Sequence, residues 1–545
     1  MKQLNRVSNA LLSICILATF LSSCGAQGES STISTNPSAA SSSSSSIVSS
    51  GEEETNTDIG YPEELTIFAP LSEHLSKTGA NDNNACAVFP ELEKITGTKV
   101  IWQHPAVGGD MAAQFNLMVT SGDYPDMIQY NWPSASGGVD TYVSDGVIIR
   151  LTELIDNYMP NYARLLDERN CRKALTYNED DIYFISEIRK DANMSVYMGP
   201  IIRGDWLDKL GLEAPKTLDE LHTVLKAFKE GDPNGDGSDV WAMSGITFTG
   251  FFPVGSLLWP YGINFGFYQI DGKIQYGPLQ PEFADGMSYI HDLYAEGLLD
   301  PDYSIQDRNA VDGKFMNNQV GYEYGIQPSK MNNAMKGTDF RAEGIQHLSL
   351  TKDSPAYVFD TNYISYLNTG CSLAISTSCK EPEKAAHWLD YLFSDEGAML
   401  TNYGVEGSAY TIVDGKPTFT EEFRENQSDS FATYNFGVMS TFPSLRMWET
   451  YSETLNPISA KGIETWSASA DTSRTLPTLT FTTEEQQTIT DKYTDIQTYI
   501  TEQYDKLVNG NTPLSDIPAI QEKLKSMGIE DVIAVYQDAL DRYNG

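Results

Sequence analysis

Short apolar segments alternate with helical ones in the first part of the chain, and this alternation restricts the fold more than any other feature. Residues 65–69 and 99–103 have the β-branched and aromatic content of strands, and residues 89–95 between them have helical character. A third strand is predicted at 126–130. Strand, helix and strand in this order predict crossover connections, and therefore an α/β fold with a mostly parallel sheet.

The predicted sheet indicates where a ligand would bind. Ligands of parallel sheets bind at the carboxyl ends of the strands. Asn131 and Trp132 follow the third predicted strand directly, so we expect both at the binding site.

Length and charge limit what the globular part can be. The 545 residues exceed what one hydrophobic core usually accommodates, so two domains are expected. The formal net charge is −39, and removing the leader residues Lys2 and Arg6 takes it to −41. Such a charge opposes nucleic acid and anionic lipid surfaces as partners and favours neutral or cationic ligands. The alternative is that the acidity only maintains solubility.

The N-terminus has the pattern of an exported lipoprotein. Basic residues precede an apolar stretch at 11–20 that is too short to span a membrane, as in a signal peptide over residues 1–23. Small residues before Cys24 and a glycine after it resemble a bacterial lipobox, in which the cysteine thiol is lipidated and becomes the mature N-terminus. Residues 24–60 are rich in serine and predict a flexible linker. The alternative is an ordinary secretory signal with a chance cysteine.

The sequence has no recognisable catalytic signature. It contains no G-x-S-x-G, H-E-x-x-H, G-x-G-x-x-G or Walker pattern, and no C-x-x-C metal motif. Cys371 and Cys379 lie at the two ends of a predicted strand, about 26 Å apart if extended, which is too far for a direct disulfide. A pair of carboxylates facing each other across a sugar, as in glycosidases, remains possible on sequence grounds.

A loop of oxygen-bearing residues has the spacing of an EF-hand-like calcium site. Asp232, Asn234 and Asp236 occupy loop positions 1, 3 and 5, and Ser238 offers its carbonyl at position 7. Asp239 falls at position 8, one residue early, and a methionine stands where a bidentate glutamate is usual. We expect a structural calcium ion with reduced affinity, and a metal-free turn is the alternative.

Several ordered motifs resemble one family. They include the segments 122–126, 203–212, 215–221, 293–300, 382–386 and 403–407. The chain from about residue 61 onward is thereby similar to family 1 extracellular solute-binding proteins of carbohydrate ABC importers, and most similar to lipoproteins of the LipO and alginate-oligosaccharide-binding type.

This resemblance implies a fold and a function. It implies two α/β lobes joined by hinge crossovers, with a cleft between them that closes on a sugar, and it implies calcium in the loop at Asp232. The first lobe is expected at 61–187 with 366–417, and the second at 188–365 with 418–545. The implied protein is a monomeric, lipid-anchored receptor without enzymatic activity that delivers an oligosaccharide to ABC permease subunits. A secreted glycan-degrading enzyme and a peptide-binding or sensor-partner receptor are the alternatives.

Aromatic residues in irregular segments are the best candidates for contacts with a sugar, because pyranose rings stack their C–H faces on such side chains. Trp388 lies on a helical apolar stripe and is predicted to be core, as is Trp206. The ligand-binding candidates, besides Asn131, are Trp132, Trp259, Tyr261 and Trp448. Exposed aromatics of this kind also serve lobe–lobe or partner contacts.

Overall fold

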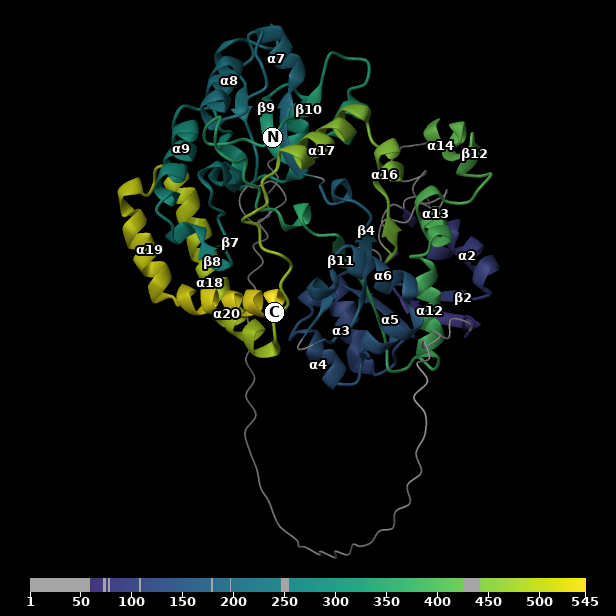
Figure 1. Ribbon diagram of the computed structural model, residues 1–545. Coiled ribbons are helices and arrows are strands. Elements are labelled where there is room, and N and C mark those ends of the chain that lie inside the picture. Colours follow the sequence, from purple (N-terminus) through teal and green to yellow (C-terminus); the bar gives the residue numbers. More distant parts are fainter. Residues whose placement is uncertain are drawn as a thin grey trace, which may run out of the picture. The chain divides into compact units, whose positions relative to one another are not determined.

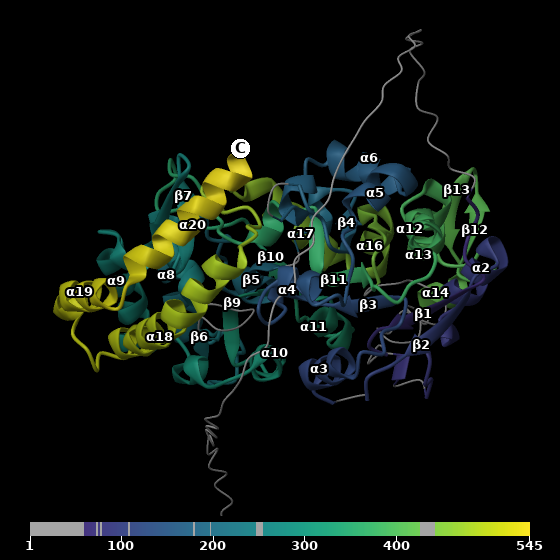
Figure 2. The same cartoon turned by 90° about the horizontal axis from the view of Figure 1, so that it is seen from below.

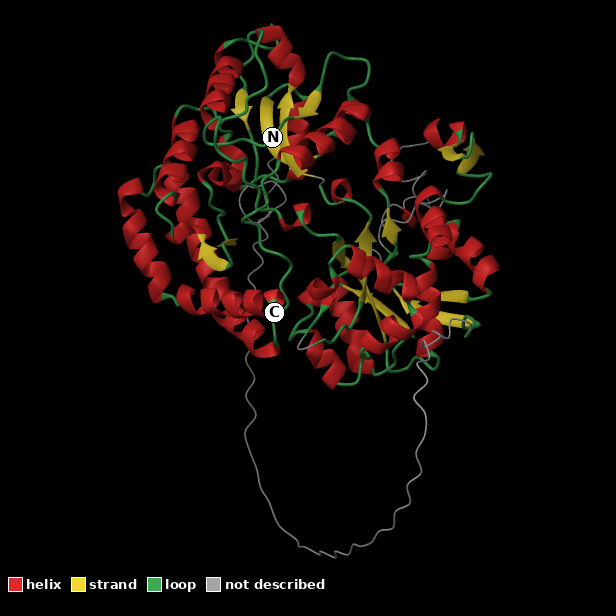
Figure 3. Ribbon diagram, in the orientation of Figure 1, coloured by secondary structure: helices red, strands yellow, loops and turns green. Residues whose placement is uncertain are grey.

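The computed structural model describes residues 59–71, 75–76, 79–106, 109–177, 180–196, 198–246, 254–425 and 442–545. The predicted signal peptide, Cys24 and nearly all of the predicted linker lie outside these residues. No helix in the described ranges combines the length and the apolarity that crossing a bilayer requires. Helices pack around both of the larger sheets, which have six and four strands (Figure 3).

The first sheet contains six strands, of which five run parallel. Its order is β14 (Leu445–Arg446), β4 (Ile185–Arg189), β11 (Leu367–Ile375), β3 (Met127–Tyr130), β1 (Glu64–Phe68) and β2 (Lys99–Gln103). Only β11 is antiparallel to its neighbours. The three strands predicted from the sequence are β1, β2 and β3, and the predicted helix between the first two is α2, so the βαβ prediction is confirmed.

Helices cover this first sheet, and a hairpin follows them. The helices are α2 (Val88–Thr96), α3 (Met111–Ser121), α4 (Val139–Ser144), α5 (Thr152–Tyr158), α6 (Pro160–Glu168), α12 (Pro382–Tyr391), α13 (Asp395–Tyr403) and α14 (Glu421–Glu425), and the hairpin is β12 (Tyr410–Val413) with β13 (Lys416–Phe419). Helix α12 contacts both α5 and α6 (Figure 2). A buried carboxylate joins two of them: Asp390 of α12 accepts hydrogen bonds from the backbone N–H of Tyr162 at 2.8 Å and the side chain of Asn161 at 2.8 Å. The free N–H groups at the start of α6 are thereby satisfied.

The second sheet has four strands, in the order β10 (Ala342–Gly344), β5 (Met198–Arg203), β9 (Val320–Ile326) and β6 (Trp241–Met243). Strand β5 is antiparallel to both β10 and β9, and β6 is parallel to β9. Its helices are α7 (Gly204–Leu210), α8 (Leu218–Glu230), α9 (Phe283–Ala295), α10 (Arg308–Met316), α11 (Ser329–Ala334), α16 (Trp448–Thr454), α17 (Pro457–Ser469), α18 (Thr483–Val508), α19 (Ile517–Ser526) and α20 (Ile529–Asn544). A second hairpin, β7 (Phe267–Ile270) with β8 (Lys273–Tyr276), belongs to the same part.

Sequence patterns account for several of these helices. The Thr217 hydroxyl caps α8 by accepting from the N–H of Glu220, and the predicted apolar stripe of this helix is buried. The late helices α18 and α20 contact each other, and they pack on α9 and β8 respectively, so that the yellow C-terminal segment lies beside teal elements in Figure 1. Trp388 and Trp206 are fully buried, as predicted.

Two hydrophobic cores accompany the two sheets, and their membership corrects the expected lobe boundaries. The expected change at 187/188 falls inside β4, which pairs along its length as far as Arg189. The expected change at 417/418 is too early, because Phe419, Phe423 and Phe442 pack in the first core and β14 completes the first sheet. No sequence pattern indicates this return, since β14 has only two residues and no strand periodicity.

Candidate functional site

The carboxyl ends of most strands lie at the two sheet edges that the connection from β4 to β5 joins. Strands β1, β3, β4 and β14 are parallel, so their carboxyl ends share one edge of the first sheet. In the second sheet β6, β9 and β10 end at the edge where β5 begins. Because β4 leads to β5 within a few residues, this pair of edges is the expected position of a ligand site.

Asn131 and Trp132 both follow β3, but only one is available to a ligand. Asn131 is exposed at the carboxyl edge. Trp132 is 0% exposed: its indole N–H donates to the carbonyl of Ile128 at 3.2 Å, and its ring meets the Phe115 ring edge-on at 5.6 Å. The prediction that Trp132 contacts the ligand is therefore wrong. It begins a 3-10 turn (Trp132–Ser134) that folds the ring back into the core.

Charged side chains are buried at the end of β4, and they are not among the residues expected at the site from the sequence. Glu187 and Arg189 share one face of this strand, with Arg189 Nε 3.6 Å from Glu187 Oε1. Asn368 of β11 donates to the same oxygen at 3.4 Å, and Arg446 of β14 lies opposite Arg189. Burial raises the pKa of Glu187, while the two guanidinium groups act to lower it. The available signal was a pair of opposite charges two residues apart in a strand whose other residues are isoleucine and serine.

Trp259 and Tyr261 belong to a 3-10 helix (Val254–Tyr261) of the second part. Trp259 is 8% exposed, with its ring edge-on to Tyr324 at 5.1 Å. Beside it lies a cavity of about 20 Å³ that His347 also lines, which has room for a water molecule but not for a sugar. Trp259 is therefore mainly a core residue.

Tyr261 is half-buried and remains accessible. Burial and the nearby carboxylates, Asp285 foremost, raise its pKa to about 12, so its hydroxyl stays protonated and can donate a hydrogen bond. Trp448 is also half-buried; it opens α16 immediately after β14, with the Tyr451 ring 6.1 Å away. These two side chains retain the exposure that stacking on a sugar requires.

A polar network supports the carboxyl edge of the second sheet. Ser244, which follows β6, donates to the fully buried Asp300 at 2.8 Å. Gln306 donates to Ser244 at 2.7 Å, and Lys314 pairs with Asp300 at 2.6 Å. Because these side chains bond to one another, we interpret the network as a structural support of this edge.

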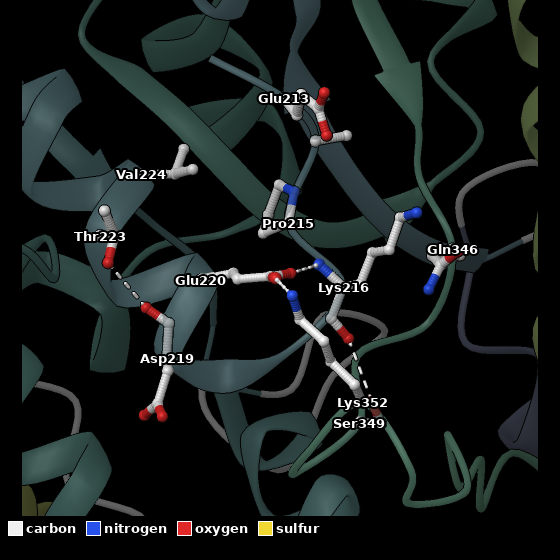
Figure 4. A pocket seen from close by; sticks show the side chains of 11 residues that line it. Glu213, Pro215, Lys216, Asp219, Glu220, Thr223, Val224, Gln346, Ser349 and Lys352 are labelled. Carbon is white, nitrogen blue, oxygen red and sulfur yellow. Dashed lines mark hydrogen bonds and ion pairs between the residues drawn. The ribbon is translucent and has the colours of Figure 1, made fainter.

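A larger pocket of about 560 Å³ lies at the start of α8 (Figure 4). Glu220 is held in its wall by the backbone N–H of Lys216 at 2.9 Å and by the ammonium of Lys352 at 3.2 Å. Charged and small side chains line it, and no aromatic ring does. It therefore lacks the stacking surface of a typical sugar site.

The loop at Asp232 is a tight turn organised by its first residue. Asp232 Oδ1 accepts from the N–H groups of Gly235 at 2.9 Å, Asp236 at 3.2 Å and Gly237 at 3.1 Å. Hydrogen bonds from Ser238 lower the pKa of Asp236, which is therefore a carboxylate at neutral pH.

Asn234 and Asp239 differ in how they relate to this turn. The Asn234 amide donates to Ser238 Oγ at 3.0 Å within the loop. Asp239 instead pairs with Lys229 of α8 at 2.6 Å, so its inclusion among the ligands is corrected. Within the described ranges no three His, Cys, Asp or Glu side chains gather closely enough to hold a metal by themselves, so any ion here would also need amide and carbonyl oxygens.

Comparison with known proteins supplies the family. The model for bacterial extracellular solute-binding proteins matches residues 85–399. The chain is 30% identical over 354 residues to the fructooligosaccharide ABC transporter substrate-binding protein FusA of Streptococcus pneumoniae, covering 63% of each chain. It is 28% identical over 391 residues to lipoprotein LipO of Bacillus subtilis, covering 69% of this chain and 73% of LipO.

Solved structures share the fold. Alginate-binding protein AlgQ2, in a structure without calcium ion, is 25% identical with a TM-score of 0.66, over 90% of this chain and all of that one. An EF-hand mutant of FusA with fructo-nystose has a TM-score of 0.68 at 23% identity, over 88% and 99% of the two chains. The predicted two-lobed α/β fold is confirmed.

Proposed function

The chain belongs to the bacterial extracellular solute-binding protein family, and from this premise we propose that it captures an oligosaccharide and delivers it to the permease of an ABC importer. The observation that carries the proposal is that the chain crosses between its two sheets at the edges where their strand carboxyl ends lie. The similarity to FusA, which is named for fructooligosaccharides, supports a sugar as the ligand class.

The ligand contacts that we propose come from this pair of edges. Asn131 supplies an exposed amide after β3, and Trp448 and Tyr261 supply half-buried rings. Rings of this kind cover the apolar faces of sugars, while amides and hydroxyls bind the sugar hydroxyl groups.

Binding would be coupled to closure of the lobes. Only a ligand with better contacts in the closed state shifts the equilibrium toward that state. We propose reversible binding of a neutral oligosaccharide without turnover, with the closed monomer as the form that the permease recognises. Lipidation of Cys24 would hold the receptor at the membrane, and the similarity to a lipoprotein supports this anchor.

The loop at Asp232 would hold a structural calcium ion. Asp232, Asn234 and Asp236 offer side-chain oxygens and Ser238 its carbonyl, a donor set that suits a hard cation. The loop lies before β6, at the end opposite the carboxyl edge, so the ion would stabilise the fold of the second lobe and have no contact with sugar.

A glycan array followed by calorimetry tests the receptor function. Wild-type protein should bind at least one oligosaccharide class, gain thermal stability in its presence, and release no cleaved product. Trp448→Ala should weaken binding at least tenfold, whereas Tyr499→Ala, which removes a half-buried ring from α18, should not. Binding to no glycan, or product in excess of the protein, would contradict the proposal.

Two substitutions test the metal. Chelator should lower the melting temperature, calcium should restore it better than magnesium, and Asp232→Ala should abolish that response. Asp239→Ala is the matched control, because this carboxylate pairs with Lys229, and it should keep the calcium response. An equal loss in both variants, or no effect of chelator, would show that the loop is a turn without metal.

A further inference from the structure

Arg189 carries a buried donor without an acceptor at the carboxyl edge of the first sheet. The residue is 7% exposed, and its Nη1 makes no hydrogen bond in the described part of the chain. Its Nε is 3.6 Å from Glu187. A buried charged donor left unpaired is costly, so such atoms in proteins meet water or a ligand.

The surroundings of Arg189 define the chemistry of the missing acceptor. Arg446 lies opposite it on β14, and Asn368 of β11 lies opposite Glu187. Asp360 is close enough that Arg189 lowers its pKa against the effect of burial. Two guanidinium groups thus face two carboxyl groups, so the cluster has no excess positive charge that a carboxylate or phosphate would neutralise. An uncharged oxygen completes it best.

The position of the cluster connects it with ligand binding. Arg189, Arg446 and Asn368 come from β4, β14 and β11, the strands at which the chain passes between its two parts. Trp448 follows Arg446 by two residues, so a sugar stacked on that ring would lie next to the ends of these strands.

We propose that Arg189 is a ligand contact whose Nη1 donates a hydrogen bond to a hydroxyl oxygen of a neutral sugar unit, with Glu187, which itself accepts from Asn368, holding the guanidinium in place. This inference rests on the proposed oligosaccharide function and names a residue and a ligand chemistry for it. A contact at the crossing strands also makes binding sensitive to the relative position of the lobes.

The test compares Arg189→Lys with Arg164→Lys, an exposed arginine of α6 that pairs with Glu168 on the same helix. Cellotriose, xylotriose, kestose and trigalacturonic acid are the probes. The tightest neutral binder should lose at least tenfold in affinity with Arg189→Lys and nothing with Arg164→Lys. Melting temperatures without ligand should differ by less than about 2 °C.

A double-mutant cycle covers the case in which Arg189→Lys is itself less stable. Singly deoxygenated forms of the same glycan are titrated against wild type and Arg189→Gln. One missing hydroxyl should weaken binding to wild type at least tenfold and make no difference to Arg189→Gln. Unchanged affinity in Arg189→Lys, absence of coupling in the cycle, or binding of trigalacturonic acid alone would overturn this inference while leaving the receptor function intact. Binding of no glycan by wild type would overturn both.

Discussion

The carboxyl group of Glu323 is buried where its ionisation is unfavourable. Replacing it with an uncharged amide should stabilise the protein, and the effect should grow as the pH rises. Glu323 lies in β9 with 0% exposure, and neither carboxyl oxygen accepts a hydrogen bond from any residue that the structure describes. A nearby cation is Arg308, whose Nη2 is 3.9 Å from Glu323 Oε1 and whose Nε contacts Asp312. Burial raises the pKa of Glu323 from 4.5 to about 7.

The sign of the effect follows from this raised pKa. The folded chain holds the Glu323 proton more tightly than the unfolded chain does, so the contribution of this residue is most favourable below pH 4.5. It declines as the pH rises toward 7 and is constant above that. The free energy of unfolding of wild type should therefore fall, relative to a Glu323→Gln variant, by about 3 kcal/mol across this range.

Urea unfolding of wild type and Glu323→Gln at pH 5, 6, 7 and 8 measures the difference. The variant should be more stable at pH 8, by up to about 3 kcal/mol, and its advantage should shrink toward pH 5. Glu230→Gln, at the exposed end of α8, controls for the loss of one negative charge. A difference that is the same at pH 5 and pH 8, or a variant less stable than wild type at pH 8, would refute the reasoning.

Three further substitutions separate core, interhelical and anchoring roles. Trp132→Ala should lower the free energy of unfolding by about 3–5 kcal/mol, more than Trp448→Ala does, as measured in urea. Asp390→Ala leaves the N–H groups at the start of α6 without their acceptor and should cost about 1–3 kcal/mol in the same assay. Cys24→Ala should move the protein from the membrane fraction to the soluble fraction in cell fractionation, and retention at the wild-type level would contradict the predicted anchor.

The sequence predicted local elements better than it predicted the site. Strands β1, β2 and β3 and helix α8 follow from apolar periodicity and a cap, which are local signals. Trp132 was misplaced because loop position does not reveal whether a ring turns back into the core. The cluster around Arg189 was not predicted, because Glu187 and Arg189 offered only a weak local signal and Asn368 and Arg446 join them through the pairing of β4 with β11 and β14.

The two-residue strand β14 has a consequence for the order in which the protein folds. It covers the outer backbone edge of β4, and β11 covers the inner one, yet these partners are made some 180 to 260 residues after β4. The first sheet therefore cannot be completed until most of the chain has been synthesised. The second part is likewise incomplete until α18 and α20 have formed. Contacts this distant in sequence slow folding and leave strand edges open to wrong partners. A chain truncated before residue 445 should therefore be prone to aggregation.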